Sequence, residues 1–330
     1  MRTKLISALC IGAAFLYFSI SCNAQFPPPA GQAGSTAIFK DSVIIVGWAT
    51  GCVVQRGYIN LFDTSLTYDG DNKANFGTEG SALGKADEAP VSLGDGGYAI
   101  LTFDHPVTNG PGYDFAVFEN GLSDTFLELG FVEVSSDGVN YFRFPAVSLT
   151  QTSKQITTFG TLDATKIDNL AGKYRVDYGT PFDLALLDGT PGLDITRITH
   201  IKIIDAVGSI KPSIARYDSQ GNIVNDPWPT PFNTGGFDLD AVGVLHFSYS
   251  TGDQVLYLYP NPVIDRITIN LFIGSIFDIV IHDISGKMVW EKKGLPNNST
   301  IDLTFLSSGI YFCTFTLENG TTVEKKIVRI

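Results

Sequence analysis

The chain of 330 residues contains few cysteines, few methionines and little positive charge. It has four Cys and two Met, and its 22 Lys and Arg residues against 34 Asp and Glu give a net charge of −12. Because no Lys/Arg cluster is present, the sequence lacks the electrostatic footprint of a nucleic-acid-binding protein. The cysteine spacing fits no metal–thiolate site. Apart from residues 5–20, no apolar run approaches the roughly 20 residues that cross a bilayer.

The N-terminal segment has the pattern of a secretory signal peptide. Arg2 and Lys4 precede the apolar run, and small residues precede Gln25. We expect residues 1–24 to be a signal peptide, cleaved between Ala24 and Gln25, so that the mature chain has no transmembrane segment. Cleavage removes two basic residues and no acid, which moves the net charge from −12 to −14. It leaves Cys52 and Cys313, in what we predict to be different domains, and this disfavours a disulfide between them.

The rest of the chain predicts short strands separated by Gly- and Pro-rich loops. It contains 34 Gly, 23 Phe and 13 Tyr, a composition typical of all-β extracellular proteins. Residues 131–136 and 139–144 alternate around Asp137–Gly138, the strongest short-range hairpin signal in the chain. Residues 98–103, 113–119, 198–204 and 237–245 are further strand candidates. The pattern favours a β-sandwich.

Residues 255–330 contain, in order, the motifs Leu256-Tyr257-Leu258-Tyr259-Pro260-Asn261-Pro262, Asp283-Ile284-Ser285-Gly286-Lys287, Ser308-Gly309-Ile310-Tyr311 and Glu324-Lys325-Lys326. With these motifs the segment resembles the type A C-terminal sorting domain of the type IX secretion system of Bacteroidetes. The resemblance implies a small immunoglobulin-like β-sandwich recognised by the secretion machinery, which would be its partner. The sorting signal then includes Pro260, Asn261, Pro262, Gly286, Lys287, Gly309, Tyr311, Lys325 and Lys326.

Several segments of residues 30–246 form a second set of motifs, among them Asp114 to Gly121, Glu133 to Gly138 and Gly235 to Val242. On these segments, residues 30–246 resemble an uncharacterised jelly-roll-like family of bacterial secreted and cell-surface proteins. The resemblance implies a jelly-roll-like, galactose-binding-like β-sandwich over residues 25–250, joined to the sorting domain by a linker at 251–254. It implies no activity, because a fold alone does not specify one.

Two acidic pairs are the candidate metal ligands. On a regular strand Asp238 and Asp240 face the same side, where their repulsion would be relieved by solvent, by hydrogen bonds or by a cation. A calcium ion, with further ligands from loops that include Asp69 and Asp71, is one interpretation. Hydrogen bonding of these side chains to backbone N–H groups in turns is the other.

Trp228 and Phe232 lie in a Pro-rich loop just before that strand and are the candidate ligand-binding residues. Rigid prolines can hold aromatic rings in place for stacking on a sugar. Alternatively, the two rings cap one end of the sandwich core.

No catalytic residue is predicted. The four His residues are scattered, and no metalloprotease or nucleophile-elbow motif is present. A glycoside hydrolase needs two carboxyl groups in one cleft; Glu119, Glu128 and Glu133 are candidates only because the chain is rich in acids.

We therefore expect a secreted or cell-surface protein, exported by the type IX secretion system, whose first domain is a non-catalytic binding or adhesion module. A polysaccharide or surface glycan, with calcium support, is the expected ligand. A structural surface component and a carboxylate-based glycoside hydrolase are the alternatives.

Overall fold

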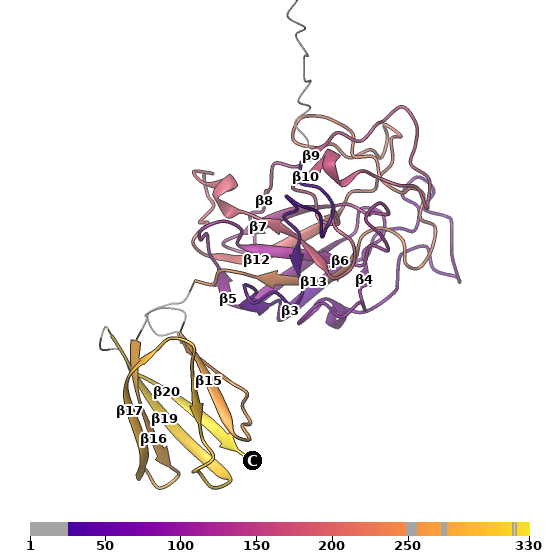
Figure 1. Ribbon diagram of the computed structural model, residues 1–330. Coiled ribbons are helices and arrows are strands. Elements are labelled where there is room, and N and C mark those ends of the chain that lie inside the picture. Colours follow the sequence, from indigo (N-terminus) through magenta and orange to yellow (C-terminus); the bar gives the residue numbers. More distant parts are fainter. Residues whose placement is uncertain (1–25, 249–255, 272–275, 319, 321) are drawn as a thin grey trace, which may run out of the picture. The chain divides into compact units, whose positions relative to one another are not determined.

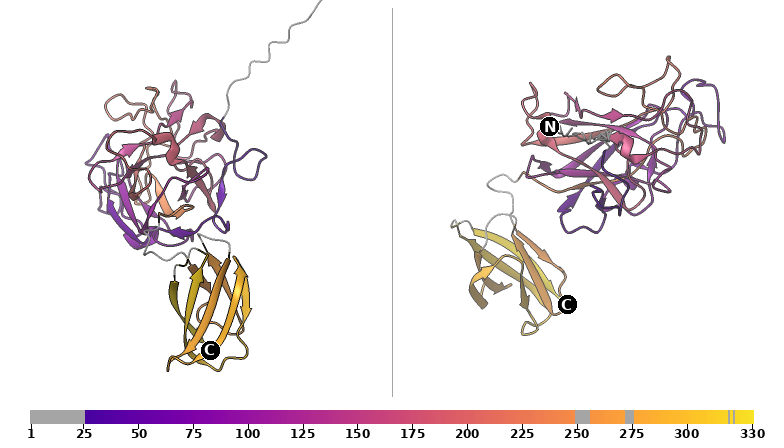
Figure 2. Two further views of the ribbon diagram at one scale, coloured as in Figure 1. Left: turned by 90° about the vertical axis from the view of Figure 1, so that its left-hand side faces the viewer. Right: turned by 45° about the horizontal axis from the view of Figure 1, so that its top comes forward.

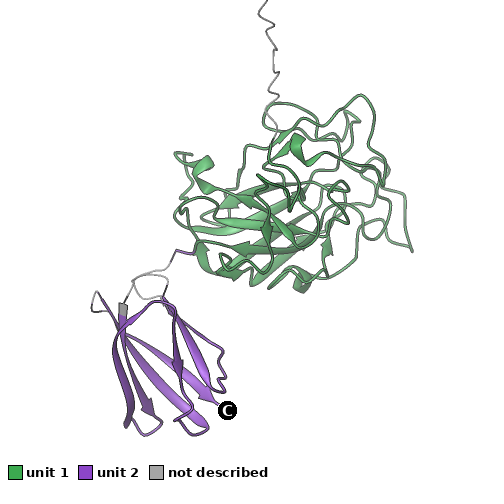
Figure 3. Cartoon of the chain, viewed as in Figure 1, with its two compact units in different colours: residues 1–246 green, residues 247–330 purple. Residues whose placement is uncertain are grey.

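The computed structural model describes residues 26–248, 256–271, 276–318, 320 and 322–330. The predicted signal peptide and the predicted linker at 251–254 lie outside these residues. The chain divides into two compact units, residues 1–246 and 247–330 (Figure 3). Strands form nearly all of the regular structure in both units, which confirms the all-β prediction.

Two antiparallel sheets form the first unit (Figure 1). The first has the strand order β1-β11-β6-β13-β2, with β4 also paired to β13. The second has the order β3-β5-β12-β7-β8. The strands of the first sheet are β1 (Ile38–Phe39), β2 (Gly47–Trp48), β4 (Val91–Ser92), β6 (Phe115–Glu119), β11 (Tyr178–Phe182) and β13 (Asp238–Val244). Those of the second are β3 (Gly51–Gln55), β5 (Tyr98–Val107), β7 (Gly130–Ser135), β8 (Phe142–Arg143) and β12 (Ile198–Asp205).

The remaining elements of this unit are short. They comprise the strand pair β9 (Val147–Ser148) and β10 (Ile167–Asp168), and the 3-10 helices η1 (Glu79–Ala82), η2 (Ala164–Lys166) and η3 (Leu184–Leu187). The views in Figure 2 show long loops extending from one side of the strands. These loops build the site described below.

The hairpin predicted around Asp137–Gly138 is confirmed. Strands β7 and β8 pair with Glu133 opposite Arg143, and the carboxylate of Asp137 accepts N–H bonds from Val139 and Asn140 at 2.8 Å each. Gly138 has φ +76°, a left-handed conformation that favours glycine. The turn residues therefore fix the register of the hairpin.

Aromatic side chains from both sheets meet in the core of the first unit. The rings of Phe115 on β6 and Phe182 on β11 stack with centroids 5.3 Å apart. Phe144, which follows β8 in the other sheet, packs edge-on against both rings. All three side chains are buried, so the two sheets form a sandwich with a shared core.

The second unit consists of a three-stranded and a four-stranded antiparallel sheet. The first has the order β14-β15-β18 and the second β17-β16-β19-β20. Their bounds are β14 (Leu256–Tyr259), β15 (Arg266–Leu271), β16 (Ile276–Asp283), β17 (Met288–Pro296), β18 (Ser299–Asp302), β19 (Gly309–Leu317) and β20 (Thr322–Arg329). Residues of both sheets, among them Ile269, Phe277 and Phe315, form one buried cluster.

Within the first unit, the carboxylate of Asp205 joins the two sheets at the end where the loops gather. Asp205 ends β12, and it accepts N–H bonds from Gly96 and Val207 at 2.8 Å and from Phe237 at 2.9 Å. Phe237 directly precedes β13 of the other sheet. The side chain is 4% exposed, so water cannot replace these bonds in the folded protein.

Replacing Asp205 with Ala should destabilise the first unit by about 3 kcal/mol or more, because each buried N–H left without an acceptor costs about 1–3 kcal/mol. Asp205→Asn keeps one carbonyl oxygen and should cost less. Denaturant unfolding of both variants against the unmodified protein measures this. Equal stability of Asp205→Ala and the unmodified protein would contradict the role assigned to this carboxylate.

Candidate functional site

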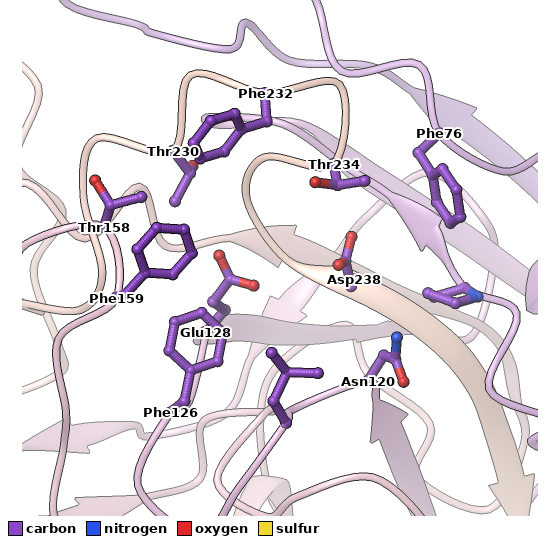
Figure 4. A pocket seen from close by; sticks show the side chains of 12 residues that line it. Phe76, Asn120, Phe126, Glu128, Thr158, Phe159, Thr230, Phe232, Thr234 and Asp238 are labelled. Carbon is purple, nitrogen blue, oxygen red and sulfur yellow. The ribbon is translucent and has the colours of Figure 1, made fainter.

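A pocket with a volume of about 240 Å³ opens among the loops of the first unit (Figure 4). Four segments contribute most of its walls: residues 120–128 between β6 and β7, 158–159 between β9 and β10, 230–234 before β13, and Asp238 at the start of β13. Phe76 and Pro90, which precede β4, complete it. The pocket thus depends on segments far apart in the sequence that the two sheets bring together.

Phenylalanine rings form one end of the pocket. Phe159 lies 6.3 Å from Phe126 and 6.3 Å from Phe232 between ring centroids, and it is nearly parallel to Phe232 with an interplanar angle of 23°. Tyr68 contacts Phe232 edge-on. Because 75% of the surface of Phe159 is exposed, its apolar ring is in contact with water and contributes little to the hydrophobic core. An apolar face that remains open beside a pocket is available for a ligand.

Two carboxyl groups, Glu128 and Asp238, point into the middle of the pocket (Figure 4). The Ser92 hydroxyl donates to Asp238. Burial, with the neighbouring charge of Asp205, raises the pKa of Asp238 to about 7, against the opposing effects of Ser92 and Arg56. Burial, followed by the charges of Asp238 and Glu119, raises the pKa of Glu128 well above its usual value. Both groups therefore bind a proton more readily than an exposed carboxyl group does.

Hydrogen bonds leave part of this carboxyl cluster unsatisfied. Glu128 is 8% exposed, and no residue in the described ranges donates a hydrogen bond to its carboxyl group. Glu119, at the end of β6, is 2% exposed, and its Oε2 likewise has no partner among the described residues. Burial and the charge of Asp238 raise the pKa of Glu119 well above its usual value. Unpaired buried acceptors are costly, and in a pocket they are typical of a binding or catalytic role.

The other buried acids have structural partners. Asp226 accepts the N–H of Leu129 at 2.8 Å, and Asp95 accepts the N–H of Leu61 at 2.8 Å and the indole N–H of Trp228 at 3.0 Å. Burial, followed by the charge of Asp205, raises the pKa of Asp95 to about 7 and the pKa of Asp226 well above its usual value. Burial alone raises the pKa of Asp205 to about 6, against the opposing effect of its hydrogen bonds. Their hydrogen bonds hold loop segments of the first unit in place.

The two predicted ligand-binding aromatics have different places. Phe232 lines the pocket, but Trp228 is 5% exposed and packs with Val207 and Ile214. The position of Trp228 therefore corresponds to the core-capping alternative.

The paired-Asp strand is less regular than predicted. A β-bulge between Leu239 and Ala241 places an extra residue, Asp240, in β13. Whereas Asp238 lines the pocket, Asp240 accepts N–H bonds from Asp87 and Glu88 at 3.2 Å. The expectation of simple alternation is wrong here because the bulge interrupts it.

The structure does not bring together the four predicted metal ligands. Asp69 and Asp71 lie in an exposed turn, where Asp71 accepts from Asn75 at 2.5 Å. Within the described part of the chain, no group of three or more His, Cys, Asp or Glu side chains is arranged to hold a metal ion. The donors do not fit a calcium site built from these residues, and calcium dependence stays a prediction.

The sequence did not single out Phe126 and Phe159, and it offered Glu128 only as one acid among many. The sequence feature that these residues share is their place in loops between strands, where large aromatic residues lie near polar ones. Such a signal is weak until the fold places the loops together.

The predicted sorting-signal residues lie in turns and strands of the second unit. Asn261, between Pro260 and Pro262, donates to the carbonyl of Lys326 and accepts the N–H of Val328, both at 2.9 Å. Gly286 has φ +81° in the turn before Lys287. Gly309 begins β19, and Tyr311 on that strand donates its hydroxyl to the Ser307 carbonyl at 2.9 Å. Lys325 and Lys326 lie on β20.

Comparison with known proteins identifies the tail. Residues 257–329 match the family described as the secretion system C-terminal sorting domain. The second unit is therefore such a sorting domain, which confirms the resemblance and indicates export to the cell surface or beyond it by the type IX secretion system. Among curated proteins, none matches the chain. The residues that the structure describes include no helix long and apolar enough to cross a membrane.

Several solved structures show distant likeness. CopC from Methylosinus trichosporium OB3b is 25% identical over 22% of this chain and 90% of its own, with a TM-score of 0.18. PorZ, a surface component of the type IX secretion system of Porphyromonas gingivalis, is 11% identical over 71% of this chain and 35% of its own, with a TM-score of 0.20.

A β-glucuronidase from Ruminococcus gnavus is 9% identical over 85% of this chain and 44% of its own, with a TM-score of 0.26. The chain thus spans less than half the length of the PorZ and β-glucuronidase structures. At these scores the likenesses carry no argument about function.

The raised pKa values predict that the first unit loses stability as pH rises from 5 to 8. A carboxyl group whose pKa is higher in the folded than in the unfolded state binds its proton more tightly when folded. Its contribution is complete below the unfolded value and is lost as pH rises through the folded value, about 7 for Asp238. Calorimetry should therefore show a falling Tm over this window.

Combining Glu128→Gln with Asp238→Asn should reduce the slope of that fall, whereas Asp104→Asn, which removes an exposed carboxyl from β5, should leave it unchanged. A Tm that is constant or rises between pH 5 and 8 would show that these carboxyls are not protonated in the folded protein.

Proposed function

We propose that the first unit is a non-catalytic carbohydrate-binding or adhesion module that the sorting domain delivers to the cell surface or the medium. The observation that carries the proposal is the pocket itself, in which the exposed ring of Phe159 and the ring of Phe232 lie beside the carboxyl groups of Glu128 and Asp238. Sugars present apolar C–H faces and hydroxyl donors, and aromatic rings and carboxyl oxygens match these two features.

The pocket suits a small, well-defined unit of a glycan. Its volume of about 240 Å³ lies below the roughly 300–1,000 Å³ of sites for drug-sized ligands. A terminal or single sugar residue is therefore a better match than an extended chain lying in a groove. The pocket lies wholly within the first unit, so binding does not require the tail.

A carboxylate-based glycoside hydrolase is the second candidate. It is favoured by one observation, that Glu128 and Asp238 face the same pocket with raised pKa values. Glycosidases require one carboxyl group that is protonated and one that is ionised. Product release separates this candidate from a binding module.

Incubation of the full chain with a panel of insoluble polysaccharides should deplete the protein from solution without releasing reducing sugar. Phe232→Ala should weaken binding about tenfold or more, since stacking on an aromatic ring is a large part of sugar affinity. Phe39→Ala, which removes an exposed ring on β1, is the matched control.

Release of reducing sugar that is abolished by Glu128→Gln would favour the hydrolase. Retention of full binding by Phe232→Ala would show that the polysaccharide does not bind in the pocket. A parallel series in EDTA tests the calcium prediction: loss of depletion that added calcium restores would support it, and unchanged depletion would contradict it.

Removal of residues 255–330 should leave the first unit in the periplasm of the producing cell, because the sorting domain is the part that the export machinery is expected to recognise. Fractionation of cells that carry the intact and the truncated chains measures this. Asn261→Ala, which breaks two bonds between the start of the tail and β20, should reduce export by destabilising the tail. Normal export of the truncated chain would refute the assignment of the tail as the export signal.

A further inference from the structure

Among the described residues that line the acidic pocket, none has a basic side chain. Among the ion pairs formed by the described residues, none involves Glu119, Glu128 or Asp238. The charge of Arg56 acts on Asp238 and lowers its pKa, but the guanidinium donates to the carbonyls of Phe76, Ser92 and Gly77. The guanidinium of Arg56 is therefore hydrogen-bonded to backbone carbonyl groups.

A buried carboxylate without a partner is unstable relative to one in water, and the protein relieves this by protonation. A positively charged ligand would also reduce the cost of burying these carboxylates, because it pairs with their ionised forms and supplies N–H donors. Glu128 is the clearest acceptor for such a ligand. It is 92% buried, points into the pocket and has no hydrogen-bond donor among the described residues.

The walls of the pocket match the remainder of such a ligand. The faces of Phe126, Phe159 and Phe232 surround one end, and the two carboxyl groups lie beside them (Figure 4). Aromatic faces attract cations as well as apolar C–H groups. A compact ligand with an apolar face and an adjacent ammonium group would therefore pack its apolar face on the rings and pair its ammonium group with the carboxyl groups.

We propose that the pocket binds a hexosamine unit that carries a free, protonated amine, with the ammonium group between Glu128 and Asp238 and the apolar sugar face on Phe159 and Phe232. The inference rests on the proposed carbohydrate-binding function and specifies its ligand class. It excludes N-acetylated sugars as preferred ligands, because the acetyl group removes the charge and adds bulk where the carboxyl groups converge.

Isothermal titration of the full chain with three matched trisaccharides at pH 6.5 tests the proposal. The trisaccharides are that of glucosamine, its N-acetylated counterpart and the neutral trisaccharide of glucose. The glucosamine form should bind at least about tenfold more tightly than either of the others. Equal or tighter binding of a neutral form would overturn the amine preference and leave the carbohydrate-binding function intact. Absence of binding by all three would overturn the amine proposal, and the polysaccharide panel would then decide the broader function.

Two isosteric variants connect the preference to the pocket. Glu128→Gln and Asp238→Asn should each reduce the preference for the glucosamine form about tenfold while keeping weak binding of the neutral form. Asp104→Asn should behave as the unmodified protein. Glu128→Asp, which keeps a carboxyl group, should retain more of the preference than Glu128→Gln does. Full preference in the Gln and Asn variants would place the amine elsewhere. A melting curve for each variant establishes that it is folded.

Proton release gives an independent measurement. The carboxyl groups that face Glu128 are Asp238, Glu119, Asp226 and Asp205, and Arg56 acts on Asp238. An ammonium ion that enters this cluster should displace a proton from it, so affinity should increase from pH 5 to pH 6.5. The heat of binding should then vary with the ionisation enthalpy of the buffer. Affinity that is independent of pH, or heats that are the same in all buffers, would contradict pairing between the amine and these carboxyl groups.

Discussion

Three backbone N–H groups from separate segments converge on the buried carboxylate of Asp205, and the arrangement of the first unit depends on this convergence. The donors are Gly96, Val207 and Phe237. Because Asp205 ends a strand of one sheet and Phe237 leads into a strand of the other, the bonds fix the two sheets at one end. Asp238, the next residue along the chain, is thereby held in the pocket.

The same end of the sandwich concentrates negative charge. Asp95 and Asp226 offset the cost of burial with bonds to Leu61, Trp228 and Leu129. Glu119 accepts backbone N–H bonds from Asn120 and Gly121, but its Oε2 has no partner among the described residues, and the same holds for the carboxyl group of Glu128. This contrast separates the acids that stabilise the fold from Glu128, which lines the pocket. Stability is lost at functional positions in many proteins, because groups arranged for a ligand are imperfectly satisfied without it.

Features that depend on neighbouring residues could be predicted from the sequence. The β7–β8 hairpin follows from Asp137–Gly138 between alternating runs, and the sorting domain follows from motifs in fixed order at the end of the chain. Features that depend on long-range contacts could not. Trp228 and Phe232 are four residues apart, yet one is buried against Asp95 and the other lines the pocket. The bulge at Asp240 was equally invisible, because register is set by the partner strand. Glu128 gained its significance only from the loops around it.

A crystal structure of the full chain with the glucosamine trisaccharide bound tests the central claim most directly. We expect one sugar ring against Phe159 and Phe232, with its amine within hydrogen-bond distance of Glu128 and Asp238. A trisaccharide bound on another surface, with this pocket empty, would contradict the account and show that Glu128 and Asp238 serve some other purpose.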